Sequence, residues 1–313
     1  MTLPTRRIGD LSVSSVGLGC MPLSFPQMLA ERDRAIATIH RALDLGITLL
    51  DTSNIYAPSW EAVGHNEALV AEALRTYDGP ADLTAVLVTT KGGITWTEGD
   101  VWGRDSSQDG LRRACLASLE QLNVSVIELY QHHRHDPAET YADQMRVMGS
   151  LKAEGLIRRI GLSNTTLAEL DLALDLLGGP DDGGVVSVQN EYSPRYRHDG
   201  DVLDRCTERG IAFLPWSPLG GADQAHDVGS RYTAFAEVGA ELGATPHEVV
   251  LAWLLALSPV VIPIPGATRP PTVDSIVRAT SLAFTVEQFD RLQATVPRQE
   301  SMYPEDQPRS PLR

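Results

Sequence analysis

The clearest folding unit in the chain is a strand–helix–strand stretch within residues 85–133. It reads AVLVTTK over Ala85–Lys91, SQDGLRRACLASLEQL over Ser107–Leu122 and VIELYQHH over Val126–His133. The two outer runs are short and apolar, which is typical of parallel strands covered on both faces. The middle run repeats apolar residues at helical spacing. We therefore predict two parallel strands joined by a crossover helix.

The same alternation repeats along the whole chain. The predicted strands are Ser15–Cys20, Thr48–Thr52, Ala85–Lys91, Val126–His133, Arg159–Ser163, Val185–Asn190, Ile211–Trp216 and Val260–Pro265. The predicted helices are Asp33–Leu45, Asn66–Arg75, Ser107–Leu122, Thr140–Glu154, Thr166–Leu177, Asp199–Glu208 and Arg231–Leu242. Eight strand units without a long polar linker predict an α/β fold, a single (β/α)8 TIM barrel formed as one domain by residues 1–313.

The two ends of the chain are expected to add to this barrel. Residues Thr5–Val13 alternate apolar and polar around Gly9-Asp10, which predicts an N-terminal β-hairpin that closes the bottom of the barrel. Extra helices are expected near the C-terminus. Residues 301–313 carry three prolines and few apolar side chains, and we expect them to form a mobile tail.

Charge and composition limit the partners of the protein. The chain has 313 residues, 42% of them hydrophobic, and 26 Lys and Arg against 41 Asp and Glu give a formal charge of −15. A field of that sign repels nucleic acid and anionic membranes. The most apolar run, Val249–Leu257, is about half of the roughly 20 residues that span a bilayer. Three cysteines without CxxC spacing and no signal-peptide pattern predict a cytoplasmic protein.

Polar side chains gather at the carboxyl ends of the predicted strands, where barrels of this type build their sites. Lys91 ends a buried run, and a buried ammonium needs a carboxylate partner, for which Asp51 is the candidate. Tyr56 follows closely enough to return to the same mouth, and an adjacent ammonium stabilises phenolate. Together with His133 at the end of the fourth strand, these residues predict a proton-transfer relay.

A metal site is the alternative interpretation of His132, His133, His135 and Asp136. Adjacent residues of a strand point to opposite faces, which opposes a site shared by His132 and His133. No other predicted strand ends in a histidine. We therefore expect no metal, and we expect His132 to pack outward against a helix.

Eight motifs follow one another in order along the chain. They are GLGCM (17–21), DTSNIY (51–56), TTKG (89–92), ELYQHH (128–133), GLSN (161–164), QNEY (189–192), WSPLG (216–220) and IPIPGATR (262–269). Together they resemble the aldo-keto reductase family over about residues 6–295. The resemblance implies an NADP(H)-dependent oxidoreductase that transfers a hydride from NADPH to an aldehyde or ketone.

The resemblance implies a catalytic tetrad of Asp51, Tyr56, Lys91 and His133. Tyr56 would give the carbonyl oxygen its proton, and Lys91, paired with Asp51, would lower the pKa of Tyr56. His133 would orient the carbonyl and donate a hydrogen bond to its oxygen.

The resemblance also implies how NADPH would lie across the rim. Ser163, Asn164 and Gln189 would bond its carboxamide, and Trp216 would stack on the nicotinamide. The pyrophosphate would be lined by Ser217, Leu219 and Gly221. The other residues expected near the cofactor are Gly19, Met21, Asp51, Gly266 and Ser275.

We expect Arg269 and Thr268 to bind the adenosine end of the cofactor. The guanidinium of Arg269 can hold a 2′-phosphate with two hydrogen bonds. This predicts NADPH over NADH. The family usually has Glu-Asn six and seven residues after this arginine, and this chain departs from that pattern with Ser275 and Ile276.

A small carbonyl compound is the expected partner, and nothing in the sequence favours one oligomeric state. Aromatic and apolar loop residues are candidates for the pocket wall: Met21, Phe25, Trp60, Trp96, Trp102 and Tyr192. Sugars, aromatic aldehydes and steroid-like ketones all fit such a wall. The alternatives are an NADP-dependent dehydrogenase of a sugar or alcohol, a nucleotide-sensing regulatory subunit like the channel-associated β subunits, and a metal-dependent hydrolase.

Overall fold

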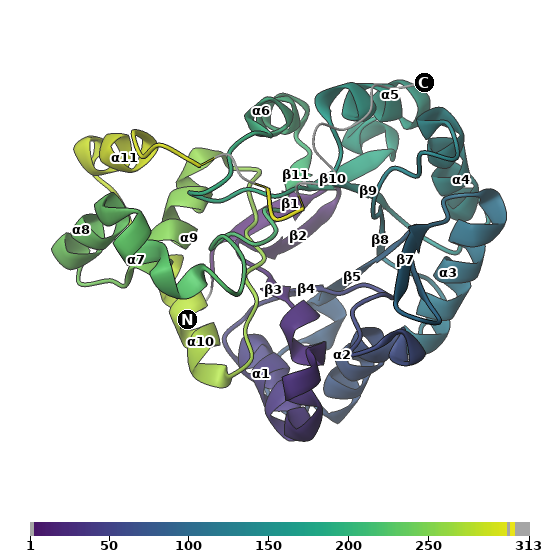
Figure 1. Cartoon of the computed structure of the whole chain (residues 1–313), viewed down its shortest axis with the longest axis horizontal. Helices are drawn as coiled ribbons and strands as arrows, with labels where there is room; N and C mark the ends of the chain where they lie inside the picture. Colours follow the sequence, from purple (N-terminus) through teal and green to yellow (C-terminus); the bar gives the residue numbers. More distant parts are fainter. Residues whose placement is uncertain (1–2, 299–300, 304–313) are drawn as a thin grey trace.

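A curled parallel sheet surrounded by helices forms the body of the molecule in the computed structural model, which describes residues 3–298 and 301–303 (Figure 1). Within that part of the chain, seven strands follow the order β3-β4-β5-β8-β9-β10-β11. They are β3 (Leu18–Gly19), β4 (Leu49–Asp51), β5 (Leu87–Gly92), β8 (Leu129–His132), β9 (Ile160–Ser163), β10 (Val185–Gln189) and β11 (Ala212–Phe213). Each pairs in parallel with the next, as the alternating sequence predicts.

The predicted eighth strand, Val260–Pro265, closes the sheet without forming a regular strand. A parallel bridge joins this segment to Phe213 of β11 on one side. On the other side, the backbone N–H of Gly19 in β3 donates to the carbonyl of Pro265 at 3.0 Å. Pro263 and Pro265 have no N–H to donate, which explains why the ladder stays incomplete. The barrel prediction is confirmed, with its last strand reduced to bridges.

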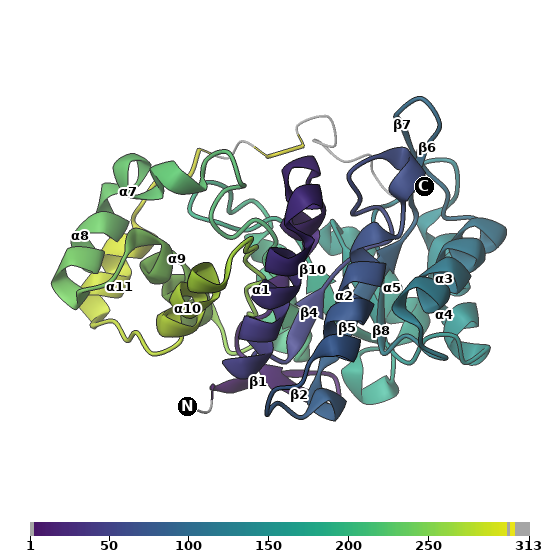
Figure 2. The same ribbon diagram turned by 90° about the horizontal axis from the view of Figure 1, so that it is seen from below.

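Helices cover the outside of this sheet (Figures 1 and 2). They are α1 (Arg32–Asp44), α2 (His65–Thr76), α3 (Gln108–Leu122), α4 (Tyr141–Ala153), α5 (Leu167–Leu177), α6 (Gly200–Arg209), α7 (Val228–Arg231), α8 (Thr233–Leu242), α9 (Pro246–Leu257), α10 (Pro270–Ala279) and α11 (Val286–Gln293). The bounds of α1 to α6 confirm the predicted ranges to within one residue. The predicted helix Arg231–Leu242 corresponds to α8, which begins two residues later, while Arg231 ends the separate short helix α7. Both helices stand with α11 to one side of the barrel in Figure 1. None of the helices in the described part of the chain is long and apolar enough to cross a membrane.

Hydroxyl caps explain where three of these helices begin. The side chains of Ser107, Thr140 and Thr166 each accept a hydrogen bond from the backbone N–H three residues further on. Such caps satisfy donors that have no partner within the helix. They start α3, α4 and α5 immediately after loops that follow β7, β8 and β9.

Two antiparallel hairpins lie at opposite ends of the barrel (Figure 2). The predicted N-terminal hairpin is β1 (Thr5–Ile8) and β2 (Leu11–Ser14), and its Ile8 and Val13 belong to the buried cluster inside the barrel. The second hairpin, β6 (Ile94–Thr97) and β7 (Val101–Arg104), follows β5 and was not predicted from the sequence.

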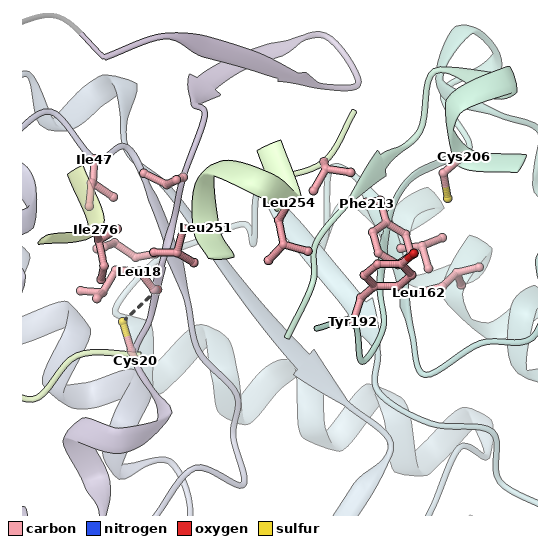
Figure 3. Close-up of a cluster of buried hydrophobic side chains, with 14 of the residues drawn as sticks. Leu18, Cys20, Ile47, Leu162, Tyr192, Cys206, Phe213, Leu251, Leu254 and Ile276 are labelled. Atoms are coloured by element: carbon pink, nitrogen blue, oxygen red, sulfur yellow. Dashed lines mark hydrogen bonds between the residues drawn. The ribbon is translucent and has the colours of Figure 1, made fainter. Parts of the chain in front are cut away.

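The larger hydrophobic core lies between the sheet and the helices (Figure 3). Tyr192 belongs to it, with its ring 5.8 Å from that of Phe213 at 90° and stacked 6.3 Å from Trp253. Only 7% of Tyr192 is exposed. The packing of the Tyr192 ring against Phe213 and Trp253 accounts for its burial, and a place in the substrate pocket stays a prediction.

Candidate active site

The carboxyl ends of the strands bring Asp51, Tyr56, Lys91 and His133 to one mouth of the barrel. Asp51 is the last residue of β4, and Lys91 lies next to the end of β5. His133 directly follows β8, and Tyr56 lies in the loop after β4. The parallel ladder explains the grouping, since it brings the ends of successive strands to the same edge.

Asp51 and Lys91 form a buried ion pair. The ammonium nitrogen of Lys91 lies 2.8 Å from each carboxylate oxygen of Asp51 and 2.8 Å from the carbonyl oxygen of Thr52. The two side chains are 0% and 4% exposed. Burial lowers the pKa of Lys91, and the charge and hydrogen bonds of Asp51 oppose that shift.

Tyr56 lies beside this pair. The ammonium of Lys91 stands over the phenol ring, 4.9 Å from its centre. Removal from water, followed by the charge of Asp51, raises the pKa of Tyr56 well above its usual value. This direction is opposite to the lowered pKa that the family resemblance implies, because burial of the phenol is the largest influence on its pKa. The Tyr56 hydroxyl therefore stays protonated at neutral pH.

His133 faces Tyr56 across the mouth, with ring centres 6.2 Å apart at 83°. Its Nδ1 lies 3.4 Å from the Ser53 hydroxyl. Burial, with the positive charge of Lys91 second, holds the pKa of His133 well below its usual value. The imidazole is therefore neutral and carries one N–H donor.

His132 points the other way, as the strand alternation predicts. Its Nε2 lies 3.1 Å from the Ser106 hydroxyl, and its ring packs edge-on against Tyr141 of α4 at 5.8 Å. Burial lowers its pKa to about 4. His132 and His133 thus belong to different environments on the two sides of β8.

Two buried glutamines, Gln131 and Gln189, complete the polar layer around Asp51. No role for Gln131 was predicted from the sequence. The Gln189 amide nitrogen donates to Asp51 Oδ1 at 2.8 Å and to the Gln131 side-chain oxygen at 3.2 Å. The Gln131 amide nitrogen donates to Thr89 at 2.8 Å and to Asp51 at 3.3 Å. Its position could have predicted its place in the site, because Gln131 lies two residues before His133 and residues at that spacing share one face of a strand.

Three side chains on the neighbouring strand ends form a second polar group. Asn164 has a left-handed backbone (φ 55°), which is rare for a residue other than glycine. Its amide nitrogen donates to the His133 carbonyl at 3.1 Å and to the Ser163 hydroxyl at 3.0 Å. Its amide oxygen accepts from the indole N–H of Trp216 at 3.1 Å. Asn164 therefore fixes Trp216 relative to His133.

The loop after β11 follows Trp216 with unusual backbone geometry. Ser217 is left-handed with φ 46°, and Gly220 and Gly221 have φ 84° and 94°. The backbone N–H of Gly220 donates to the carbonyl of Ser217 at 2.8 Å, which closes this turn. Leu219, also expected at the pyrophosphate, lies half-buried in the same loop.

Gly19 and Gly266 serve barrel closure. A Cβ on Gly19 would lie 2.7 Å from the carbonyl oxygen of Ile264, and one on Gly266 would lie 2.6 Å from Pro22. Both glycines therefore permit the close approach of backbone at the seam. Met21, expected near the cofactor, begins the short helical turn beside this seam and is half-buried.

The residues expected at the adenosine end divide into two sets. Arg269 and Thr268 precede α10 at the surface, where the Arg269 Nε donates to Thr272 at 3.3 Å. Ser275 instead donates to Glu248 of α9 at 2.8 Å, so its hydroxyl proton is committed inside the protein. Ile276 is buried in the core (Figure 3).

The segment Ser301–Tyr303 lies beside Glu191 and Trp216 at the mouth of the barrel. Ser301 donates to Glu191 at 2.8 Å, and the backbone N–H of Met302 lies 3.1 Å from the same carboxylate. The Tyr303 ring lies 5.8 Å from that of Trp216 and carries the Arg134 guanidinium 4.8 Å over its face. The beginning of the predicted mobile tail is thus held at the site, and residues 304–313 lie outside the described part of the chain.

The remaining candidate pocket residues lie on loops of the mouth. Trp96 and Trp102 stack at 4.4 Å across the β6–β7 hairpin, and Trp102 is 54% exposed. Trp60 begins a short helical turn in contact with β6, and Phe25 is half-buried. The β6–β7 hairpin that carries both tryptophans stands at the end of the barrel opposite to the β1–β2 hairpin (Figure 2).

A parallel β/α barrel with a buried Asp–Lys pair, a tyrosine and a neutral histidine at its carboxyl-end mouth defines a class of oxidoreductase barrels. The sequence profile of the aldo/keto reductase family matches residues 15–297, and the chain belongs to this family.

Relatives and solved structures agree with this assignment. The chain is 32% identical to an uncharacterized oxidoreductase of Schizosaccharomyces pombe over 92% of this chain and 88% of that protein. It is 33% identical to pyridoxine 4-dehydrogenase of Escherichia coli over 86% and 90% of the two chains. A glycerol dehydrogenase structure from Gluconobacter oxydans matches with TM-score 0.79 at 24% identity, covering 99% and 97%. An aldo-keto reductase of Klebsiella pneumoniae in complex with NADPH matches with TM-score 0.77 at 24% identity, covering 96% and 98%.

Proposed function

We propose that this protein reduces the carbonyl group of an aldehyde or ketone with NADPH. The observation that carries the proposal is the meeting of Tyr56 with Lys91, Asp51 and His133 at one mouth of the barrel. A protonated phenol and a neutral imidazole are the two donors that a carbonyl oxygen needs as it gains negative charge.

The residues around this mouth fit the proposed cofactor. Asn164, Ser163 and Gln189 place amide and hydroxyl groups beside the half-buried indole of Trp216, as a flat ring with a carboxamide requires. The left-handed loop after Trp216 suits a pyrophosphate. The exposed Arg269 suits a 2′-phosphate, which favours NADPH over NADH.

NADPH, when bound, supplies a hydride to the carbonyl carbon. Tyr56 holds the proton that the carbonyl oxygen receives, and its raised pKa keeps that proton in place until the oxygen becomes basic. The Lys91 ammonium over the ring stabilises the phenolate charge that develops as the proton leaves. His133 donates its N–H to the same oxygen, and Asp51 holds Lys91 charged.

The proposed substrate is a small carbonyl compound with a ring or apolar portion. The stacked Trp96 and Trp102 on the β6–β7 hairpin support this class. The 33% identity to pyridoxine 4-dehydrogenase makes pyridoxal a specific candidate. Oxidation of an alcohol by NADP⁺ is the second candidate, supported by the two relatives that are named dehydrogenases.

The experiment that tests this function is NADPH oxidation against a carbonyl panel. It includes pyridoxal, aryl aldehydes, ketosugars and quinones, with Tyr56→Phe protein as the control. Turnover that depends on both NADPH and Tyr56 supports the proposal. Equal rates with both proteins across the panel would overturn it.

We further propose that residues 1–313 act as one domain in the cytoplasm. Two observations support this proposal: α10 packs against α1, which joins the two ends of the barrel, and the three cysteines are free and buried.

A further inference from the structure

A bridge of two buried amides joins Asp51 to a strand on the far side of the barrel interior. Gln131 and Gln189 are 0% and 2% exposed. Both amide nitrogens donate to Asp51 Oδ1, at 3.3 Å from Gln131 and 2.8 Å from Gln189. A carboxylate only accepts hydrogen bonds, which fixes the orientation of both amides.

Gly161 lies on β9, the strand between the two that carry the glutamines. It is in register with Gln131 of β8 on one side and with Ser187 of β10 on the other. A Cβ on Gly161 would lie 2.8 Å from Cγ of Gln131 and 2.5 Å from the Ser187 hydroxyl. The missing side chain therefore opens the passage through which glutamines of non-adjacent strands meet.

The two amides differ in what else they must do. Under the proposed function, Gln189 also binds the carboxamide of the cofactor. Gln131 has no proposed contact with the cofactor: its amide nitrogen donates to Thr89 in the barrel wall at 2.8 Å as well as to Asp51, and its oxygen accepts from Gln189. Gln131 is therefore the amide donor that stays on Asp51 when Gln189 serves the cofactor.

We propose that Gln131 is a positioning residue of the active site, which holds the Asp51 carboxylate in the orientation that gives both of its oxygens to Lys91. The inference rests on the proposed function. Its basis is the juxtaposition of the Gln131 amide with Oδ1 of Asp51, the oxygen that also accepts from Lys91. Without this donor, Gln189 alone holds Oδ1, and the carboxylate can turn away from one of its two contacts with Lys91 once Gln189 serves the cofactor.

Lys91 passes the effect on to the proton donor. Its ammonium faces Asp51 from β4, Thr52 beside it and the Tyr56 ring in the following loop. A Lys91 that loses one carboxylate contact no longer stands over that ring in a single position. Proton transfer from Tyr56 then slows, whereas the groups that touch the carbonyl compound are unchanged.

The test compares Gln131→Met with Ser187→Ala. Methionine keeps the length of the side chain and removes the amide donor. Ser187 is a matched control because it is fully buried in the same interior, and its hydroxyl has no partner among the described residues. We expect Gln131→Met to lower kcat about tenfold, the scale of one hydrogen bond to a charged group, with KM for the carbonyl changed less than about twofold. Ser187→Ala is expected to keep kcat.

A double-mutant cycle separates positioning from a merely structural role. In an Asp51→Asn background, Gln131→Met is expected to lower kcat no further, since the charge that it positions is gone. The same tenfold loss in both backgrounds would contradict the inference. Thr89→Val, which removes the partner that fixes the Gln131 amide, is expected to give a smaller loss in the same direction. If Gln131→Met does not fold, the kcat of Thr89→Val is measured in its place.

Cofactor affinity supplies a readout without turnover. With Gln131 lost, Gln189 is the remaining amide donor of Asp51, so NADPH is expected to bind several-fold more weakly to Gln131→Met by fluorescence titration. Unchanged kcat and affinity in a folded Gln131→Met protein, with Tyr56→Phe inactive, would overturn this inference and leave the proposed function standing. A wild-type protein that oxidises no NADPH with the panel would overturn the proposed function itself.

Discussion

The ammonium of Lys91 lies 2.8 Å from both carboxylate oxygens of Asp51, and neither side chain is more than 4% exposed. The third ammonium proton is directed to the carbonyl oxygen of Thr52 at 2.8 Å. Lys91 therefore acts on Tyr56 through space, over the face of the ring, and not through a hydrogen bond to the phenol. Besides the catalytic role that we propose for it, a buried ion pair of this kind should contribute to stability.

Removing one partner of this pair should destabilise the fold. Lys91→Met leaves the Asp51 charge buried without its cation, and we expect the free energy of unfolding to fall by about 3–5 kcal/mol. The double variant Lys91→Met/Asp51→Asn should recover part of this loss. Urea denaturation measures both changes. Arg146→Met is the control, because its ion pair with Asp143 is exposed and should contribute less than about 1 kcal/mol. Equal losses in the two single variants would contradict the prediction.

Strand ends were predictable because burial and chemistry agree there. Asp51, Lys91 and His133 each follow an apolar run, and a barrel brings the ends of such runs together. The eighth predicted strand, Val260–Pro265, forms only bridges. Pro263 and Pro265 satisfy the apolar pattern of a strand but have no N–H to donate to its hydrogen-bond ladder.

Other features were beyond the sequence for physical reasons. The pKa of Tyr56 is set first by how deeply the fold buries the phenol and next by the charge of Asp51, and both depend on the tertiary structure. Tyr192 looked available at a strand end, yet packing against Phe213 and Trp253 buries it. The meeting of Gln131 with Gln189 needs the gap at Gly161, which involves three strands.

The buried histidines should make the fold sensitive to acid. His132 has a pKa of about 4 in the folded protein, against 6.5 as the usual value. Below pH 6.5, His132 binds a proton in the unfolded chain but stays neutral in the folded protein. The free energy of unfolding therefore decreases as the pH falls from 6.5 to about 4. One such group contributes about 1.4 kcal/mol per pH unit, or about 3 kcal/mol over this window. Urea denaturation across the window should show this slope, to which His133 adds in the same direction.

The contribution of His132 can be separated by substitution. His132→Gln should reduce the slope of the free energy of unfolding against pH by the contribution of about one proton. His226→Gln, at a side chain that is 73% exposed, is the matched control for the substitution itself. A slope equally steep with and without His132 would show that this residue is not the source.

Arg269 should decide between the two nicotinamide cofactors. Arg269→Ala removes a guanidinium matched to the 2′-phosphate, so NADPH binding should weaken by about 1–3 kcal/mol while NADH binding stays the same. Fluorescence titration with each cofactor measures both affinities. Arg146→Ala, a surface arginine on α4, is the control for net charge. Equal weakening of NADPH and NADH would exclude a role at the 2′-phosphate.

The segment Ser301–Tyr303 should compete with the cofactor. Tyr303 stands against Trp216, the residue on which we propose that the nicotinamide stacks, and Met302 stands against Gly221. Tyr303→Ala removes one aromatic contact, worth about 0.5–1.5 kcal/mol, and NADPH should bind roughly two- to tenfold more tightly. Quenching of tryptophan fluorescence measures this affinity. Weaker binding would mean that the segment closes over the cofactor, contrary to the prediction.

The most direct test of the account is the rate of NADPH oxidation by Tyr56→Phe protein, measured with the best carbonyl substrate and at saturating cofactor. If Tyr56 supplies the proton, the variant should lose about 10²- to 10⁴-fold in kcat while its NADPH affinity changes less than about twofold. Turnover within about twofold of the wild-type rate would show that the proton comes from elsewhere and would contradict the proposed mechanism.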